Sequence, residues 1–436
     1  ARDRRRHGVS TPLRLGVAGL GTVGGGLVRI IRTHGDLMAA RCGRPVTLTA
    51  VSARNRGRDR GVDLSGYDWE DDPVALARRG DVDLVVELMG GADGPAKATV
   101  EAAIDAGKDV VTANKAMLAL HGQALAERAE AAGCVIRFEA AVAGGIPVVK
   151  TLTEGFAGNR VERISGVMNG TCNYILTRME HTGLPYADIF EEARALGYLE
   201  ADPSLDVGGI DAAHKLALLA AIGHGCRVDF AGVTIEGIER ISIDDIRHAA
   251  DMGYRIKLLG VARMTGAGLE QRMSPCLVPA DSPIGQVEDA INMVVLEGDM
   301  AGRITLSGAG AGAGPTASAV AADIADIARG ARLSTFGQPA AGLTTATPAE
   351  TGAAAAYYLR MELADKPGAL ARVAAALGAA GVSIDRMRQY RHAAETAPVL
   401  IVTHPATRAA LDRALATLPE TEVVMGTPVA LRIEAL

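Results

Sequence analysis

LRLGVAGLGTVGGGLVRII, residues 13–31, has the pattern of a buried strand followed by a glycine turn and a helix. Within it, Gly19, Gly21 and Gly24 have the spacing GxGxxG. The first glycine allows a tight turn, the second lets the backbone approach a pyrophosphate, and the third lets the helix pack closely on the strand. The stretch therefore predicts a dinucleotide-binding turn in which the helix N-terminus faces the anion.

Further strand candidates recur at helix-sized intervals, with Ala-rich helical stretches between them. These candidates lie at 46–52, 82–88, 109–112 and 134–138. Such alternation predicts a parallel sheet with helices on both faces, which binds ligands beyond the carboxyl ends of its strands. Lys115, at the end of TANK, follows one of these strands and is expected at that edge, with a plain surface lysine as the alternative.

The loop after the second strand is basic. It reads SARNRGRDR, with arginines at 54, 56, 58 and 60, where an acid would normally hold the ribose hydroxyls. Arginine suits a 2′-phosphate, so this loop favours NADP(H) over NAD(H). Arg54 lies nearest the strand end and is the better candidate, while we interpret the other three as a solvated loop.

Composition narrows the class of protein. At 436 residues the chain predicts two or three domains, and its 48% hydrophobic content predicts a globular fold. The net charge of −6 argues against a bulk nucleic-acid binder. Five well-separated cysteines without a CxxC pair fit reduced thiols in a cytoplasmic protein. No apolar run approaches the ~18 residues of a membrane span.

Acidic residues gather in LGYLEADPSLDVGGIDAAHK, residues 196–215, where a loop is expected before a helix that begins near Asp211. Asp211 and Lys215 are four residues apart and therefore share one face of that helix. The pair is either a helix-starting acid with an ordinary ion pair, or a substrate clamp beside a proton donor. A loop with many acids needs a cationic partner, such as the ammonium group of a substrate.

Three residues before that loop have more than one interpretation. Glu139, ahead of a glycine-rich turn, either holds a hard cation together with backbone carbonyls or is a turn acid bonded to nearby amides. Thr171 either caps the helix that follows it or touches a ligand. No Cys-His arrangement is visible around Cys172, so we interpret it as a small buried residue.

The C-terminal part has a pattern of its own. Residues 331–355, rich in Thr, Ala and Pro without periodicity, are typical of a linker. After them, strands are expected at 357–363, after Gly381, at 397–405 and at TPVALRIE, with helices at 369–379 and 408–418. That order is βαββαβ, the ferredoxin-like unit.

Six motifs in order carry a resemblance to a known family. They are GVAGLGTVGGG, TANK, EAAVAGGIPVVK, MNGTCNYILT, EADPSLDVGGIDAAHK and PTASAVAADI, between about residues 13 and 330. Together they resemble homoserine dehydrogenase, and the C-terminal part resembles an ACT regulatory module. The family usually has a loop near GPGAGGMPT where this chain has GAGAGAGPT at 308–316, so this loop is expected to be looser.

The resemblance implies reversible reduction of L-aspartate 4-semialdehyde to L-homoserine with NAD(P)H, in the biosynthesis of threonine, methionine and isoleucine. Lys215 matches the general acid/base lysine, and Lys115 matches a second active-site lysine. Substrate contacts are implied for Glu200, Asp211, Thr171, Tyr198 and Asp206. Cofactor contacts are implied for Gly19, Gly21, Thr22, Val23, Gly24, Arg54, Lys115, Gly197 and Gly312, with NADP(H) preferred and NAD(H) possible. A monovalent-cation site for Na+ or K+ is implied at Glu139 with the carbonyls of Val142, Gly144 and Ile146.

The expected fold is α/β. It has a Rossmann-type dinucleotide-binding domain at 12–145 and an α+β catalytic and dimerisation domain at 146–330, whose end returns to pack on the first. A linker at 331–355 precedes an ACT module at 356–436. The Asp365–Gly368 turn matches the effector loop of such modules, and L-threonine is the expected effector. Family analogy implies a cytoplasmic homodimer or homotetramer without nucleic-acid or membrane partners.

The residues leave two alternative functions. A thioester-forming semialdehyde dehydrogenase would need an activated cysteine, for which Cys172 is the candidate. A non-catalytic sensor of cofactor and amino acid would bind without turnover, and the clustered lysines and acids argue against it.

Overall fold

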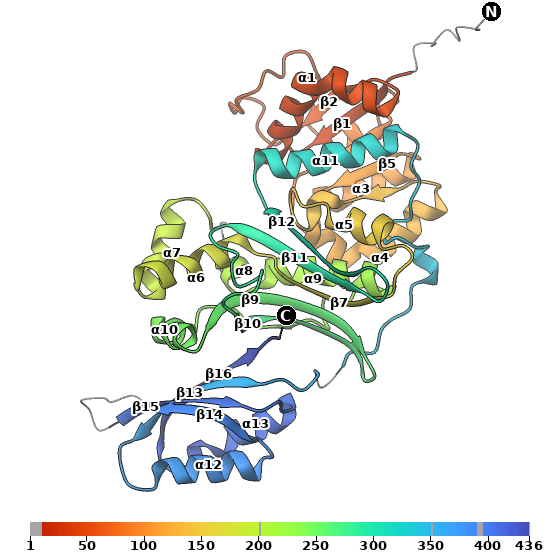
Figure 1. Cartoon of the computed structure of the whole chain (residues 1–436). Helices are drawn as coiled ribbons and strands as arrows, with labels where there is room; N and C mark the ends of the chain where they lie inside the picture. Colours follow the sequence, from red (N-terminus) through yellow and green to blue (C-terminus); the bar gives the residue numbers. More distant parts are fainter. Residues whose placement is uncertain (1–10, 200–201, 350–351, 390–395, 436) are drawn as a thin grey trace, which may run out of the picture. The chain divides into compact units, whose positions relative to one another are not determined.

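The structure, a computed structural model, describes residues 11–199, 202–349, 352–389 and 396–435 (Figure 1). The chain forms two compact units, and each unit is built from three separate stretches of the sequence. The first consists of Ala1–Gly170, Asp211–Val233 and Ile291–Ala346, and the second of Thr171–Ile210, Thr234–Ala290 and Thr347–Leu436.

A six-stranded parallel sheet in the order β3-β2-β1-β4-β5-β6 opens the first unit. Its strands are β1 (Leu13–Ala18), β2 (Val46–Ser52), β3 (Asp68–Trp69), β4 (Leu84–Glu87), β5 (Asp109–Thr112) and β6 (Ile136–Arg137). The helices between them are α1 (Thr22–Cys42), α2 (Pro73–Arg78), α3 (Pro95–Asp105) and α4 (Lys115–Ala131). The parallel sheet expected from the alternating pattern is confirmed, with the short β3 as an additional strand.

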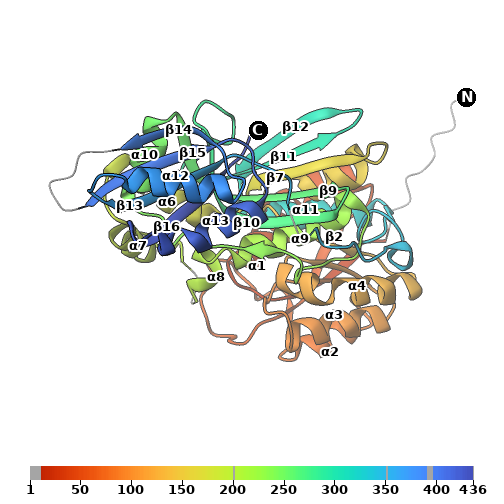
Figure 2. The ribbon, with the colours of Figure 1, turned by 90° about the horizontal axis from the view of Figure 1, so that it is seen from below.

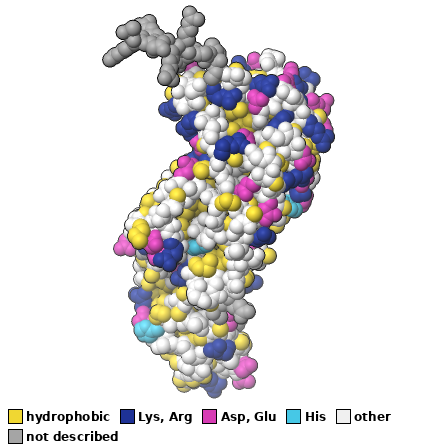
Figure 3. All heavy atoms as spheres, turned by 90° about the vertical axis from the view of Figure 1, so that its right-hand side faces the viewer, with side chains coloured by type: hydrophobic (Ala, Val, Ile, Leu, Met, Phe, Trp, Pro, Cys, Tyr) yellow, Lys and Arg dark blue, Asp and Glu magenta, His cyan; other side chains and the backbone are white. Residues whose placement is uncertain are grey.

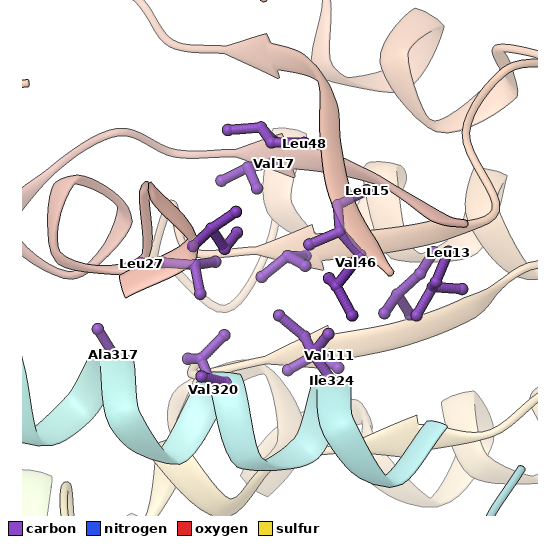
Figure 4. Close-up of a cluster of buried hydrophobic side chains, with 14 of the residues drawn as sticks. Leu13, Leu15, Val17, Leu27, Val46, Leu48, Val111, Ala317, Val320 and Ile324 are labelled. Atoms are coloured by element: carbon purple, nitrogen blue, oxygen red, sulfur yellow. The ribbon is translucent and has the colours of Figure 1, made fainter. Parts of the chain in front are cut away.

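One face of this sheet is covered by α1 together with α11 (Ala313–Ala328), which comes from far along the chain. Leu15 and Val17 of β1 share a buried cluster with Leu27 of α1 and with Val320 and Ile324 of α11 (Figure 4). Each such side chain contributes about 1.5–3 kcal/mol when fully buried. The late helix α11 is therefore part of the layer that holds the glycine turn in place.

The opposite face is covered by α2, α3 and α4, which pack in sequence order (Figure 2). Gly16, between the inward-facing Leu15 and Val17, lies on this side, where a Cβ atom would come within 2.7 Å of Leu76 on α2. Because helices cover both faces of the sheet, β1 is apolar on both sides, as strands in parallel sheets usually are.

Antiparallel strands and a buried helix complete the first unit. The strands pair in the order β7 (Val161–Val167), β11 (Ile291–Gly298) and β12 (Gly302–Ala309). The short helices η1 (Glu139–Ala141), α5 (Val148–Lys150) and η2 (Thr151–Gly155) connect β6 to β7. The helix α9 (Ile210–His224) packs on β7, since a Cβ atom at Gly223 would lie 2.7 Å from Ile164.

The described part of the second unit contains a long hairpin and four helices beside the C-terminal module. The hairpin joins β9 (Tyr254–Thr265) to β10 (Gly268–Pro279), and β8 (Thr234–Ile235) pairs with β10. The helices are α6 (Gly170–Thr182), α7 (Tyr186–Ala195), α8 (Ser204–Val207) and α10 (Ile243–Asp251). The parallel pairing of Cys276 and Leu277 on β10 with Arg432 and Ile433 joins the hairpin to the last strand.

The C-terminal module has the expected order βαββαβ. Its elements are β13 (Tyr357–Ala364), α12 (Ala369–Ala379), β14 (Ile384–Gln389), β15 (Thr396–Thr403), α13 (Arg408–Thr417) and β16 (Val424–Ile433). The strands pair antiparallel in the order β16-β13-β15-β14, and both helices lie on one face of the sheet (Figure 1). The prediction of a ferredoxin-like unit is confirmed.

The segment at 331–355 is docked along its described part. Phe336 is buried and meets the ring of Phe138 edge-on, with 5.7 Å between ring centroids. Within the first unit Thr344 bridges Cys226, and within the second Pro348 bridges Leu269. Among its described residues the segment has only the short helix η3 (Ala340–Gly342), and these contacts hold it at three points.

One face of the molecule carries intermixed charges (Figure 3). On the face shown in Figure 3, basic and acidic side chains alternate without an extended region of one sign. All five cysteines are buried free thiols. Across the described residues, no helix combines the length and the apolar character that a membrane crossing requires.

Candidate active site

The glycine turn lies between β1 and α1. Gly19 has φ +104°, and a Cβ atom on Gly24 would lie 2.1 Å from the carbonyl oxygen of Gly19, so helix and turn touch through these glycines. A Cβ atom on Gly21 would meet nothing within 4 Å, which leaves open space in front of the backbone. Because α1 begins at Thr22, its first N–H groups face this space without intrahelical partners. The turn fits the pyrophosphate of a dinucleotide.

The basic loop after β2 is folded around one of its arginines. Arg60 donates from Nε to the carbonyl of Leu20 at 3.1 Å and from Nη1 to the carbonyl of Arg58 at 2.7 Å. Its guanidinium also lies 5.6 Å from the ring centroid of Trp69. The interpretation of Arg60 as a solvated residue was therefore wrong: it braces the glycine turn. Arg54 is exposed just beyond β2, as expected.

A buried acid joins the carboxyl ends of β4 and β5. Glu87 accepts hydrogen bonds from the backbone N–H of Met89 at 2.6 Å and from the Thr112 hydroxyl at 2.6 Å. The same hydroxyl accepts from the backbone N–H of Asn114 at 3.0 Å, and Asn114 caps α4 through Met117. Burial raises the pKa of Glu87. Local spacing does not predict this network, although the single glutamate in the apolar stretch VDLVVEL is a usable signal for it.

The two lysines singled out in the sequence meet at one carboxylate. Asp211 Oδ2 accepts from Lys215 Nζ at 2.7 Å, and Oδ1 pairs with Lys115 Nζ at 2.8 Å. Lys215 also donates to the carbonyl of Met168 at 2.9 Å, and Asn169 donates to Asp211 Oδ2 at 3.3 Å. Helix α9, the N-terminus of α4 and the turn after β7 thus converge on Asp211.

The two lysines explain why Asp211 stays ionised although it is buried. Burial alone would raise the pKa of Asp211, but attraction and hydrogen bonds from Lys215 and Lys115 outweigh it and hold the pKa well below its ordinary value. With both amines protonated, the three side chains carry a net charge of +1. Within the described residues the Lys215 ammonium donates two hydrogen bonds, and an ammonium has three protons. The third proton of this ammonium has no acceptor among the described residues.

The expected substrate residues Thr171, Tyr198 and Asp206 belong to the second unit, and Glu200 lies outside the described residues. Thr171 donates its hydroxyl proton to the carbonyl of Tyr198 at 2.9 Å. Gly197, with φ +75°, ends α7 in a turn that directs this carbonyl. Asp206 is buried in α8. The substrate contacts of these side chains and the cofactor contact of Gly197 stay predictions.

The carboxylate of Glu139 is committed to the backbone. Its two oxygens accept hydrogen bonds from the N–H groups of Val149 at 2.9 Å and Lys150 at 2.8 Å. The side chain therefore matches the alternative of a turn acid bonded to nearby amides. Burial raises its pKa to about 7. No group of three His, Cys, Asp or Glu side chains suited to a metal is found among the described residues.

The glycine-rich loop before α11 is tightly packed at its centre. A Cβ atom on Gly310 would lie 2.0 Å from the Asn292 side chain, and one on Gly144 would lie 2.4 Å from the backbone of Gly310. The expectation of a looser loop was wrong, because glycine is needed for this close approach. Gly312 precedes α11 with φ +125°.

Cys172 is fully buried, and its thiol lies 3.2 Å from the carbonyl oxygen of Asp206. The prediction of a small buried residue is confirmed. His214 lies against Phe230 with 4.3 Å between ring centroids, and burial lowers its pKa. These contacts provide no base for a thiolate nucleophile at Cys172.

Fold and site together define an oxidoreductase that uses a dinucleotide, with an appended ACT domain. Three family models match in order: the homoserine dehydrogenase NAD-binding domain over 19–139, homoserine dehydrogenase over 147–325 and the ACT domain over 357–420. The chain therefore belongs to the homoserine dehydrogenase family and acts on a CH–OH group with NAD(P).

Similar proteins agree over the whole length. Homoserine dehydrogenase of Neisseria gonorrhoeae is 40% identical over 433 residues, which cover 98% of this chain and 99% of that protein. The crystal structure of a homoserine dehydrogenase from Thiobacillus denitrificans has a TM-score of 0.92 at 38% identity, covering 97% of this chain and 98% of that one. A hyperthermophilic archaeal homoserine dehydrogenase mutant in complex with NADPH has a TM-score of 0.62 at 26% identity, covering 72% and 97%.

The Glu87 network generates a prediction. Glu87→Leu leaves the Met89 N–H and the Thr112 hydroxyl without their buried acceptor, which costs about 1–3 kcal/mol of stability for each lost partner. We expect a lower melting temperature and a loss of kcat/KM of about 10-fold, because Asn114 and Lys115 lose their support. Glu87→Gln keeps one carbonyl oxygen, so it should retain most of the melting temperature and most of kcat/KM. Glu101→Gln on α3 is the control. A Glu87→Leu enzyme with unchanged melting and kinetics would contradict this role.

Proposed function

We propose that Lys215 transfers the proton of the reaction, and that Asp211 and Lys115 hold it in place and set its charge environment. The observation that carries this proposal is the single carboxylate bound by two lysines, with one Lys215 proton not used among the described residues. The cluster lies beyond the carboxyl end of β5, where parallel sheets present their catalytic groups.

The reaction is the interconversion of L-homoserine and L-aspartate 4-semialdehyde. A dinucleotide held at the Gly19–Gly24 turn would supply the hydride to the aldehyde carbon, and the aldehyde oxygen would then carry the negative charge of an alkoxide. Lys215 donates a proton to that oxygen in the reducing direction and accepts it back in the oxidising direction. Its ammonium also stabilises the developing negative charge, as an oxyanion donor does in other enzymes, where one donor is worth about 2.7–4 kcal/mol.

Asp211 has a different role from the direct substrate contact implied by the resemblance. Both of its oxygens already accept from lysines, so we assign it the positioning of Lys215 and Lys115. The cluster's net positive charge favours an alkoxide over a neutral alcohol. We assign the binding of the substrate's ammonium group to Glu200, as the family resemblance implies. The resemblance also implies substrate contacts for Thr171, Tyr198 and Asp206.

Replacement of Lys215 by alanine tests the proposal. We expect kcat to fall by about 10²–10⁴-fold, the range typical of lost acid–base catalysis, while the Kd for NADPH stays within a few-fold. Steady-state oxidation of L-homoserine, followed through NADPH absorbance, measures the first, and fluorescence titration the second. Lys97→Ala, a surface lysine on α3, is the matched control. A Lys215→Ala enzyme within a few-fold of wild-type kcat would remove the proton-transfer role.

We also propose NADP(H) as the preferred cofactor. The glycine turn accommodates the pyrophosphate through the residues at 19–24, and Arg54 supplies positive charge where the ribose would lie. The archaeal relative solved with NADPH agrees with this preference. Gly312, at the start of α11, is a further cofactor contact implied by the family.

The preference is tested by Arg54→Ala. We expect kcat/KM with NADPH to fall about 10-fold, with kcat/KM for NADH little changed, because only the former loses a charge-assisted hydrogen bond. Arg41→Ala, at the far end of α1, provides the control. A wild-type enzyme that prefers NADH, or a variant that loses both cofactors equally, would refute this use of Arg54.

A monovalent cation is proposed at the turn after β6, held by the backbone carbonyls of Glu139, Val142, Gly144 and Ile146. The support is that the Glu139 carboxylate is occupied elsewhere, and that oxygen ligands without a cluster of charges suit Na+ or K+ better than a transition metal. The turn lies against the loop before α11 through Gly144 and Gly310, so a bound ion would stabilise that loop.

Ion removal tests the cation site. After dialysis into tetramethylammonium chloride, we expect kcat/KM to fall several-fold, with recovery on adding KCl or NaCl at constant ionic strength. Tetramethylammonium is too large for a cage of carbonyls and controls for screening. Equal activity in all three salts would exclude a functional cation.

Three expectations from the resemblance stay predictions: L-threonine bound at the Asp365–Gly368 turn, assembly as a homodimer or homotetramer, and a cytoplasmic location. We propose the boundaries 12–145, 146–330 and 356–436 for the three domains. The match of the ACT family model over 357–420 supports the last of these.

A further inference from the structure

Lys257 is a buried cation that the proposed mechanism does not use. It lies on β9 in the second unit, and only 1% of its surface is exposed. Among the residues that the structure describes, its ammonium donates to neutral oxygens, to Asn173 Oδ1 at 3.0 Å and to the carbonyl of Val287 at 2.5 Å. A buried lysine without a bound carboxylate is unusual and calls for a physical reason.

The acids near Lys257 are bound by another residue. Arg255, two residues earlier on the same strand, pairs with Glu180 at 3.0 Å and with Glu288 at 2.9 Å. Burial lowers the pKa of Lys257 to about 8, so the side chain is mostly protonated at neutral pH. A buried charge costs stability, whereas a well-packed apolar side chain of similar volume would not carry that cost. The reason for Lys257 therefore lies in what its hydrogen bonds hold in place.

Lys257 and Asn173 form a closed set of hydrogen bonds with the segment at 287–289. The Asn173 amide donates from Nδ2 to the carbonyl of Val287 at 3.2 Å and to that of Asp289 at 2.9 Å, while its Oδ1 accepts from Lys257. Asp289 has φ +54°, a left-handed conformation that persists in a non-glycine residue when the surroundings hold it. Both amide protons and the amide oxygen of Asn173 are in use, so this side chain has one orientation.

Asn173 is one of three consecutive residues in the first turn of α6 that bind different segments. Thr171 donates to the carbonyl of Tyr198 at 2.9 Å, and the Cys172 thiol lies 3.2 Å from the carbonyl oxygen of Asp206. Successive side chains on a helix point about 100° apart, so fixing one of them fixes the rotation of the turn. The contacts that fix Asn173 therefore also set the directions of Thr171 and Cys172.

We propose that Lys257 is a positioning residue for the part of the site that binds L-homoserine. Through Asn173 its ammonium holds the first turn of α6, and this turn directs Thr171 toward Tyr198. All of these residues belong to the second unit. The inference rests on the substrate contacts proposed for Thr171 and Tyr198, and it is independent of the proton transfer proposed for Lys215.

Lys257→Met tests this role, because methionine keeps an unbranched apolar chain and removes the ammonium. Lys108→Met is the matched control. Lys108 is also buried, and its ammonium also donates to two carbonyls, those of Ala77 at 2.7 Å and Arg79 at 2.5 Å. It directly precedes β5, at the edge of the parallel sheet opposite the lysine cluster.

Three measurements on the full-length enzyme separate a positioning role from a structural one. Steady-state oxidation of L-homoserine gives kcat and KM, fluorescence titration gives the Kd for NADPH, and thermal unfolding gives Tm. In Lys257→Met we expect KM for L-homoserine to rise about 10-fold or more, with kcat and the Kd for NADPH within about threefold, because substrate-binding groups lose their support. In Lys108→Met we expect a lower Tm with KM unchanged. A Lys257→Met enzyme whose KM for L-homoserine equals that of Lys108→Met would overturn the proposal.

Asn173→Ala shows whether Lys257 acts through Asn173. We expect this variant to raise KM for L-homoserine to a similar extent, and the double variant to be no worse than the more impaired single one, because both changes break the same set of contacts. Effects that multiply in the double variant would overturn the proposal. If Lys257→Met does not fold, Asn173→Ala is compared with Lys108→Met in its place, and an unchanged KM has the same consequence.

Thr171→Val distinguishes this inference from the substrate contact on which it rests. A raised KM in Thr171→Val with a wild-type KM in Lys257→Met overturns the inference alone. A wild-type KM in Thr171→Val with a raised KM in Lys257→Met removes the contact proposed for Thr171 and supports Lys257 as the residue that holds the turn. A wild-type KM in both variants overturns both.

Discussion

The buried carboxylate of Asp211, bound between two ammonium groups, is the interaction on which the site depends. A charge in that position is tolerated only when it is paired and hydrogen-bonded, because removing it from water costs several kcal/mol. Here Lys215, Lys115 and Asn169 all donate to it. The same pairing holds two flexible side chains in one place, so the positive charge that the proposed mechanism requires needs no rearrangement to form.

That pairing requires the parallel sheet to be rigid at its carboxyl edge. Lys115 begins α4, and its position depends on the hydrogen bond that Glu87 accepts from the Thr112 hydroxyl and on the one that this hydroxyl accepts from the Asn114 N–H. Each of these groups is buried and has a partner, as a low-dielectric site demands. The covering helices contribute in the same way, because α11 returns from late in the chain to pack beside α1. The site is therefore a property of the whole first unit and not of one loop.

Local patterns in the sequence predicted what depends on local spacing. The GxGxxG turn, the alternating strands and the βαββαβ order follow from periods of two and 3.6 residues, and the Asp211–Lys215 pair follows from one helical turn. Contacts between distant segments left no such pattern. Lys115 meeting Asp211, Arg60 bracing Leu20 and the Glu139 carboxylate turned to Val149 depend on tertiary packing, which spacing does not encode. Glu87 was the exception: a single acid in an apolar strand is costly unless it has partners, and that rule alone would have marked it.

The ACT domain contacts α10 through Asp245, and the same residue caps the N-terminus of that helix. Asp245 is fully buried and forms the capping box of α10 with Ser242, whose hydroxyl donates to it at 2.7 Å. The same carboxylate binds Arg360 and accepts from the Tyr358 hydroxyl at 3.3 Å. Undocking the ACT sheet would therefore remove partners from a buried acid that also begins α10, so the helix terminus and the domain contact are coupled. A change at the ACT sheet that moved Arg360 or Tyr358 would therefore also act on the first turn of α10, because Asp245 is a partner in both contacts.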